Sequence, residues 1–135
     1  MEIGAKILDV YVSFHTAKRL HELGFSLYTN YQYDENKNKT HYTLEQCAVY
    51  DVLGKPVLYI PTCEQAYTWI RQTYPGWEIN ITYTNGWHFI VKNIDGYIYK
   101  EPQIPDMDYN TAFDWGILHV LNRVGDDVKN DEDFE

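Results

Sequence analysis

The chain is poor in cysteine, with two among its 135 residues, and these two fit neither a metal site nor a disulfide framework. Cys47 and Cys63 belong to no Cys-x-x-Cys pattern and have no matching histidine pair of the kind a zinc site needs. We therefore expect two reduced, partly buried thiols. No glycine-rich phosphate loop, nucleophile elbow or His-Glu-x-x-His pattern occurs, so the sequence predicts no cofactor, no metal and no catalytic residue.

Basic residues are also scarce, since 11 lysines and arginines stand against 20 aspartates and glutamates. They are scattered along the chain, apart from the pairs Lys18/Arg19 and Lys37/Lys39. Because binding to a phosphate backbone needs clustered positive charge, we expect no direct contact with nucleic acid.

Long apolar runs are missing as well. No stretch approaches the roughly 18 apolar residues that a membrane-spanning helix needs. The first twelve residues, MEIGAKILDVYV, lack the basic start, the apolar stretch and the small-residue cleavage site of a signal peptide. We therefore expect an intracellular, cytoplasmic protein that makes no membrane contact.

Negative charge and tyrosine are what the chain has in excess. Residues 125–135 carry −5 of the total formal charge of −9, and we expect 126–135 to form a disordered acidic tail. Residues 1–125 suit a single domain. Aromatic residues make up 16% of the chain, including 13 tyrosines, which argues against disorder and is typical of half-covered sheets and contact surfaces.

Three helices have recognisable ends. The first runs between an N-cap at Ser13 and a stop at Gly24, and the second begins with a capping box formed by Thr62 and Gln65. The last spans about 108–124, where apolar residues recur at helical spacing, and we expect Gly125 to end it. Asp106, Asp108 and Asp114 lie at or near its start, where capping and the helix dipole explain a carboxylate better than acid–base catalysis does.

The middle of the chain is less clear. Residues 26–33 alternate and predict a strand, 34–41 are polar and predict an exposed loop, and 57–60 predict a short strand. Residues 42–53 are ambiguous. They contain a strand-like CAVYDV segment bounded by Gly54 and Pro56, and we expect it to pair with its neighbour.

Residues 77–101 predict a three-stranded meander. Apolar and polar residues alternate from Trp77 onward, and Asn85-Gly86 marks a hairpin. A two-residue turn would mix apolar with polar faces. A three-residue loop, 84–86, instead pairs Ile81 with Phe89, and the apolar pattern therefore selects this register. The same argument at 94–96 pairs Val91 with Tyr99.

Together these elements predict an α+β fold. We expect an antiparallel sheet that includes the C-terminal three-stranded meander, with about three helices packed on its apolar face. The opposite, outer face of the meander would then carry the following residues: Glu78, Asn80, Thr82, His88, Ile90, Lys92, Ile98 and Lys100.

This outer face is the candidate site for a protein partner, because an uncovered sheet with isoleucines among polar residues accepts another protein readily. Ordinary surface exposure explains two isoleucines equally simply. The candidate contact residues are His88, Ile90, Lys92, Ile98 and Lys100. The unpaired edge of the sheet also allows a homodimer.

Histidine and cysteine chemistry offers a weaker alternative. A thiol at a helix start, as at Cys63, can have a lowered pKa, and a histidine brought close in three dimensions would complete a nucleophilic pair. No local signature supports this pair. The chain has five histidines, none with the spacing of metal ligands, and we expect surface or satisfied core positions for all of them: His15, His21, His41, His88 and His119.

Three segments carry a family resemblance. They are YVSFHTAKRLHELGF (11–25), PTCEQAYTWIRQTY (61–74) with its Trp-[Ile/Leu]-Arg core, and the following WEINI strand with a Trp-x-Phe hairpin. They cover about half of the chain, which resembles an uncharacterised family of small proteins carried by phages and mobile elements of gut bacteria. The resemblance implies a shared fold, transfers no catalytic residue, and implies an accessory protein that acts on a host or phage macromolecule.

The leading hypothesis from the sequence is a non-enzymatic interaction protein, an inhibitor or an adaptor. The alternative is a small-ligand protein that holds a metabolite or a nucleotide between the sheet and a helix. An enzyme that uses Cys63 or the scattered histidines comes third.

Overall fold

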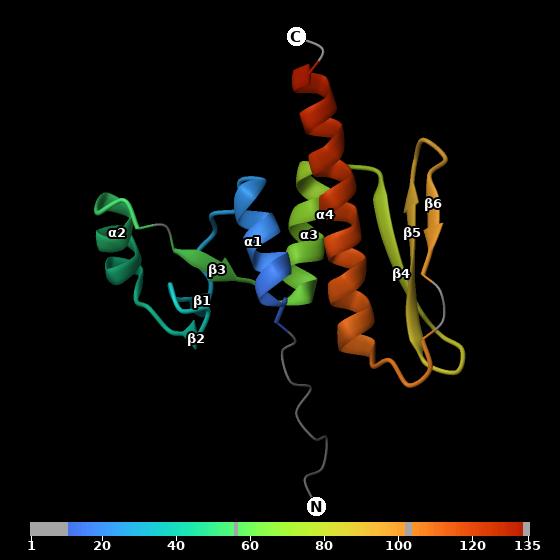
Figure 1. The fold of residues 1–135 in the computed structure, drawn as a ribbon, viewed down its shortest axis with the longest axis horizontal. Helices are drawn as coiled ribbons and strands as arrows, with labels where there is room; N and C mark the ends of the chain where they lie inside the picture. The colour runs from blue at the N-terminus through green and yellow to red at the C-terminus, as the bar shows by residue number, and fades with distance from the viewer. Residues whose placement is uncertain (1–10, 56, 102–103, 134–135) are drawn as a thin grey trace, which may run out of the picture.

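The computed structural model describes residues 11–55, 57–101 and 104–133, and these residues form an α+β fold with four helices and two three-stranded antiparallel sheets. The meander forms one side of the molecule, three helices stand beside it, and the smaller sheet and the remaining helix lie on the far side (Figure 1). The helices are α1 (Phe14–Glu22), α2 (Leu44–Val52), α3 (Cys63–Thr73) and α4 (Tyr109–Asp133).

The predicted helix starts are confirmed by their capping bonds. The Ser13 hydroxyl accepts a hydrogen bond from the Thr16 N–H at the start of α1. Thr62 and Gln65 form both bonds of a capping box at α3. At α4, Asp108 Oδ1 accepts from the Thr111 N–H at 2.7 Å, so this carboxylate is a helix cap.

The prediction of a strand within 42–53 is wrong, because Leu44–Val52 is helix α2. Its start carries the same T-x-x-Q signal as α3. The Thr43 side chain accepts from the Gln46 N–H, and the Gln46 side chain accepts from the Thr43 N–H. These two bonds satisfy donors that an uncapped helix start leaves open, and they outweigh the strand preference of Val49 and Tyr50.

The predicted end of the last helix at Gly125 is also wrong, since the α4 backbone continues as a helix to Asp133. The acidic stretch 126–133 therefore lies within α4 and is not the disordered tail that we expect from its charge, while 134–135 fall outside the described residues. Gly125 has a packing role instead. A Cβ atom there would collide with the Arg19 guanidinium, so the glycine provides the space in which Arg19 of α1 lies against α4.

The meander has the predicted register. It consists of β4 (Trp77–Tyr83), β5 (Trp87–Asn93) and β6 (Ile98–Lys100), in the order β4-β5-β6. Ile81 pairs with Phe89 across the three-residue loop, and Val91 pairs with Tyr99. Asn85 and Gly86 both have positive φ, 58° and 135°, as this tight loop requires.

The other strands form a second sheet rather than extending the meander. Its order is β2-β1-β3, with β1 at Tyr31–Tyr33, β2 at Lys39–Thr40 and β3 at Leu58–Ile60. The strand expected at 26–33 is therefore shorter, and the expected loop at 34–41 contains β2. The short strand expected at 57–60 is confirmed.

The main apolar core lies between the helices α1, α3 and α4 and the inner face of the meander. The predicted stripe of α4 faces it, and Ile117, Val120 and Leu121 have no exposed surface. We use "body" for residues 11–25 and 58–125, and "arm" for residues 26–55, which hold β1, β2 and α2. No residue of the arm belongs to the buried apolar cluster of the core.

The free edge of β4 is partly occupied. The Ile79 N–H donates a hydrogen bond to the Tyr67 hydroxyl of α3 at 3.0 Å, so this N–H takes no part in pairing with β5. The Tyr67 ring is held between two neighbours, with the Arg71 guanidinium 4.6 Å from its centroid and the Phe113 ring at 6.0 Å.

Candidate functional site

The outer face of the meander has the predicted composition. The cross-strand pairs place its residues in two rows, Glu78–Lys92–Ile98 and Asn80–Ile90–Lys100. Lys92, Ile98 and Lys100 are exposed, and Ile98 keeps 66% of its surface in solvent. Each row mixes one isoleucine with polar or charged neighbours, so the face is only sparsely apolar.

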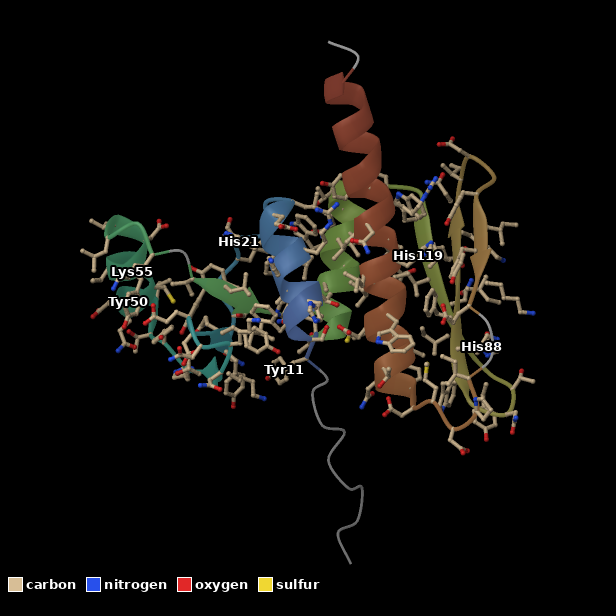
Figure 2. The ribbon with its side chains drawn as sticks, viewed as in Figure 1. Tyr11, His21, Tyr50, Lys55, His88 and His119 are labelled. Carbon is tan, nitrogen blue, oxygen red and sulfur yellow. The ribbon has the colours of Figure 1, made fainter. Side chains whose placement is uncertain are left out.

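Two of the five candidate contact residues are less accessible than predicted. His88 is buried, with 2% of its surface exposed, and Ile90 is half-buried. The Glu101 N–H donates to the Phe89 carbonyl and the Trp87 N–H donates to the Met107 carbonyl, so the chain after β6 returns beside the residues that flank His88. We attribute the burial of His88, which lies at the meander (Figure 2), to this return.

The thiol of Cys63 does not have the lowered pKa expected at a helix start. Its residue is 1% exposed, and burial, followed by the charges of Asp114 and Glu64, raises the pKa to about 12. Asp114 is itself buried and accepts a hydrogen bond from the Ser13 N–H at 2.9 Å. A thiol that stays protonated is a poor nucleophile, and the environment of Cys63 therefore favours a core position over catalysis.

His119 lies in an aromatic stack between α4 and the meander. Its ring is 4.1 Å from the Tyr99 ring at an interplanar angle of 17°, and its Nε2 is 2.8 Å from the Tyr97 hydroxyl. Burial, and then the charge of Arg123, lowers the pKa of His119 below its ordinary value of 6.5. The ring is thus a neutral packing element of the interface between α4 and β6.

No metal-binding cluster was found. Within the ranges that the structure describes, no group of three or more histidine, cysteine, aspartate or glutamate side chains could hold a metal ion. Over the same ranges, no helix is both long enough and apolar enough to cross a membrane.

Helix α2 carries the densest group of exposed apolar side chains. Leu44, Val49, Val52 and Leu53, which follows directly, keep 64%, 57%, 87% and 62% of their surfaces in solvent. Only Cys47 of this helix is buried. Figure 1 shows α2 at the outer end of the molecule, separated from the body by the small sheet.

The exposed apolar residues of α2 lie on one side of the helix. Successive residues are rotated by about 100°, so Leu44, Ala48 and Val52 form one row, and Val49 and Leu53 form the next, which begins with the exposed Glu45. The five apolar residues are all exposed, whereas Cys47 lies on the opposite side. We call these five residues the α2 face. Sequence reasoning missed it because the segment was interpreted as a strand, although the T-x-x-Q capping signal at Thr43 was available.

Two cavities open on the described surface. One, of about 310 Å³, lies between α2 and the turn that joins β1 to β2. The other, of about 340 Å³, lies between α3 and the chain around Leu27, with Trp69 and Tyr28 in its walls. Tyr50 and Lys55 both line the first cavity, and the Lys55 N–H donates a hydrogen bond to the Tyr50 carbonyl at the end of α2 (Figure 2).

Comparison with known proteins adds no assignment. No family model, no curated protein and no solved structure matches this chain. The resemblance to small phage and mobile-element proteins therefore stays a prediction from the sequence, and the site is argued from geometry alone.

Proposed function

We propose that the protein is a non-enzymatic interaction module, an inhibitor or an adaptor, and that it binds a partner protein through the α2 face. The observation that carries this proposal is the exposure of Leu44, Val49, Val52 and Leu53 on and next to a nine-residue helix. Exposed apolar patches on small proteins are typical of contact surfaces. The setting we propose is a phage or mobile element, and the target a host or phage protein.

The energetics of α2 support this proposal. A nine-residue helix is marginal on its own in water, and α2 buries only Cys47 against the rest of the chain. Burying one large aliphatic side chain contributes about 1.5–3 kcal/mol. A partner that covers the α2 face would recover part of this contribution at each of four positions, and the sum would offset entropy that is lost on binding.

The shape of α2 indicates what the partner offers. A single helix of about two and a half turns, exposed along one side, fits an apolar groove between two elements of another protein. The exposed Glu45 lies among the five apolar residues of the α2 face, so the groove would be apolar with a polar or basic group opposite this carboxylate. The outer face of the meander is the second candidate surface, because Ile98 on it is 66% exposed and Ile94, in the adjoining turn between β5 and β6, is 81% exposed.

Site-specific photo-crosslinking tests which surface binds. A photoreactive amino acid is placed at position 52 on the α2 face or at position 98 on the meander, and each protein is irradiated in a host lysate. We expect one protein to be crosslinked from position 52 and not from position 98. The same product should disappear in the double variant Val49→Asp and Leu53→Asp.

The matched control is the double variant Ile94→Asp and Ile98→Asp, which alters two isoleucines of similar exposure on the meander. It should keep the crosslink from position 52. Unchanged thermal melting of both double variants shows that they are folded. Loss of the product in the meander variant alone, or crosslinking from position 98 alone, would contradict the proposed site.

A further inference from the structure

The cavity beside α2 combines charges of both signs with aromatic walls. It is lined by Tyr33, Asp34, Glu35, Asn36, Tyr42, Tyr50, Lys55, Val57 and Leu58. These residues come from the turn between β1 and β2, from α2 and its end, and from the approach to β3. A volume of about 310 Å³ is at the small end of the range for ligand sites and suits a small metabolite.

The charged groups at this cavity have no ionic partner in the described part of the chain. The one salt bridge found there joins Arg19 to Glu22, in α1. Asp34 Oδ1 accepts from the backbone N–H groups of Asn36 and Asn38, at 2.8 and 2.9 Å, and this fixes the turn. The second Asp34 oxygen, the Glu35 carboxylate and the Lys55 ammonium therefore belong to residues that line the cavity without forming an ion pair with one another.

The walls between these charges are aromatic and aliphatic. The rings of Tyr42 and Tyr50 lie 5.0 Å apart at an angle of 56°, and Val57 is buried beside them. Burial, followed by Tyr50 and the two carboxylates, raises the pKa of Tyr42, so its hydroxyl stays protonated and can donate a hydrogen bond.

We infer that this cavity binds a free α-amino acid with a large apolar side chain. The ligand ammonium group lies against Asp34 and Glu35, its carboxylate lies against Lys55, and its side chain packs on the rings of Tyr42 and Tyr50. One ligand thus neutralises both sets of charges that the chain leaves unpaired. A simple cation would leave Lys55 unpaired, and a simple anion would be repelled by the two carboxylates.

This site is separate from the α2 face. The lining residues include none of the five residues of that face, so a ligand and a partner protein can be tested independently. Failure of the ligand experiment leaves the crosslinking result untouched, and the reverse also holds.

The experiment is a titration followed by the backbone amide signals of the ¹⁵N-labelled chain. L-Phenylalanine is the probe, with L-phenylalaninamide, which lacks the carboxylate, and N-acetyl-L-phenylalanine, which lacks the ammonium group. We expect L-phenylalanine to shift the amides of Glu35, Asn36 and Lys55. Loss of one ion pair at an exposed site should weaken binding by about fivefold, so each analogue should bind that much less tightly.

Two variants link each charge to its partner. Lys55→Met should weaken the binding of L-phenylalanine by about fivefold. It should leave the binding of the amide analogue unchanged, because that analogue has no carboxylate that could contact Lys55. Glu35→Gln should weaken L-phenylalanine and leave the N-acetyl analogue unchanged. Lys100→Met and Glu78→Gln, which change exposed charges on the meander, are the matched controls and should have no effect.

Three results would overturn the inference. The first is the absence of any shift with L-phenylalanine up to its solubility limit. The second is a set of shifts confined to the other cavity, around Leu27 and Trp69. The third is equal binding of all three compounds to the unaltered chain, since that would show contact with the rings alone.

Discussion

The body and the arm of this molecule are stabilised in different ways. The body buries a continuous apolar cluster that includes Leu20, Ile70 and Leu121. The arm buries only Thr29, Gln32 and Cys47, and two of these are polar. One chain therefore combines a region with a continuous buried apolar core and a region that buries few side chains of its own and packs Tyr31 and Tyr33 against that core.

Thr29 and Gln32, the two buried polar residues of the arm, connect its segments by hydrogen bonds. The Gln32 amide donates to the Thr29 carbonyl and accepts from the Tyr42 N–H. The Thr29 hydroxyl donates to the Tyr31 carbonyl and accepts from the Ile60 N–H, which joins the arm to β3 of the body. Such bonds fix geometry well but contribute little net stability, so the arm should open more readily than the body.

The largest expected effect is a cavity in the body. Leu121→Ala removes a fully buried side chain of α4 and should lower the free energy of unfolding by about 2–5 kcal/mol. The matched arm variant Leu53→Ala, at a position 62% exposed, should change it by less than about 0.5 kcal/mol. Urea denaturation measures both, and similar losses in the two variants would contradict the division into body and arm.

A comparison of two helical glycines sharpens the account of α4. A Cβ atom at Gly116 would lie 2.9 Å from Ile79 Cγ2 and 3.3 Å from Phe89 Cβ, both inside the core. Gly116→Ala should therefore cost about 1–3 kcal/mol.

The matched variant, Gly125→Ala, meets only the end of the Arg19 side chain, which can move aside. It should be neutral or stabilising by up to about 1 kcal/mol, because alanine favours a helix. Thermal or urea unfolding gives both values. A larger loss of unfolding free energy for Gly125→Ala than for Gly116→Ala would show that Arg19 cannot move aside and that its site on α4 is rigid.

The third prediction concerns the buried polar residues of the arm. Gln32→Leu leaves the Tyr42 N–H and the Thr29 carbonyl without this partner, and should cost about 1–3 kcal/mol. Hydrogen exchange should accelerate within 26–55 and stay unchanged in α4. Gln32→Glu keeps an acceptor for Tyr42 but buries a carboxylate against the Thr29 carbonyl, and should accelerate exchange at least as much. An equal acceleration in α4 would mean that the arm and the body unfold as one unit.

The smallest expected effect is a dependence on pH at the contact between α4 and the meander. The pKa of His119 is lowered in the folded chain, so the unfolded chain binds a proton at higher pH than the folded chain does. The stability contributed by neutral His119 is complete above its ordinary pKa of 6.5 and is lost as the pH falls below that value. Urea unfolding at about pH 7.5 and about pH 5.5 should show the decline, and His119→Gln should reduce it.

Local patterns in the sequence were sufficient for the meander register and for the helix starts of the body. Alternation from Trp77 to Tyr83 and the Asn85-Gly86 turn selected the register of the meander, because a slip by one residue would turn Ile81 and Phe89 to opposite faces. The helix caps at Ser13 and Thr62 were also predictable from the sequence. Each cap satisfies backbone N–H donors within three residues of the helix start, so it depends on neighbouring residues only.

Features that depend on distant residues were not predictable. A glycine at position 125 is typical of a helix end. Only the position of Arg19 on α1 explains why this glycine lies inside the helix. Alternation places His88 on the outer face, but it contains no information about the chain that later returns beside β5. For α2, the valines favour a strand while the capping box at Thr43 favours a helix, and the sequence alone did not show which preference is stronger.

The hydroxyl of Tyr67 has a consequence on a scale larger than one molecule. An open strand edge is a template on which further copies can add, and fibres grow in this way. By accepting the N–H of Ile79, in the middle of β4, Tyr67 withdraws one of the donors that an incoming strand would need. Arg71 and Phe113 lie against the ring in this position, so a strand that added to this edge of β4 would first have to displace the phenol.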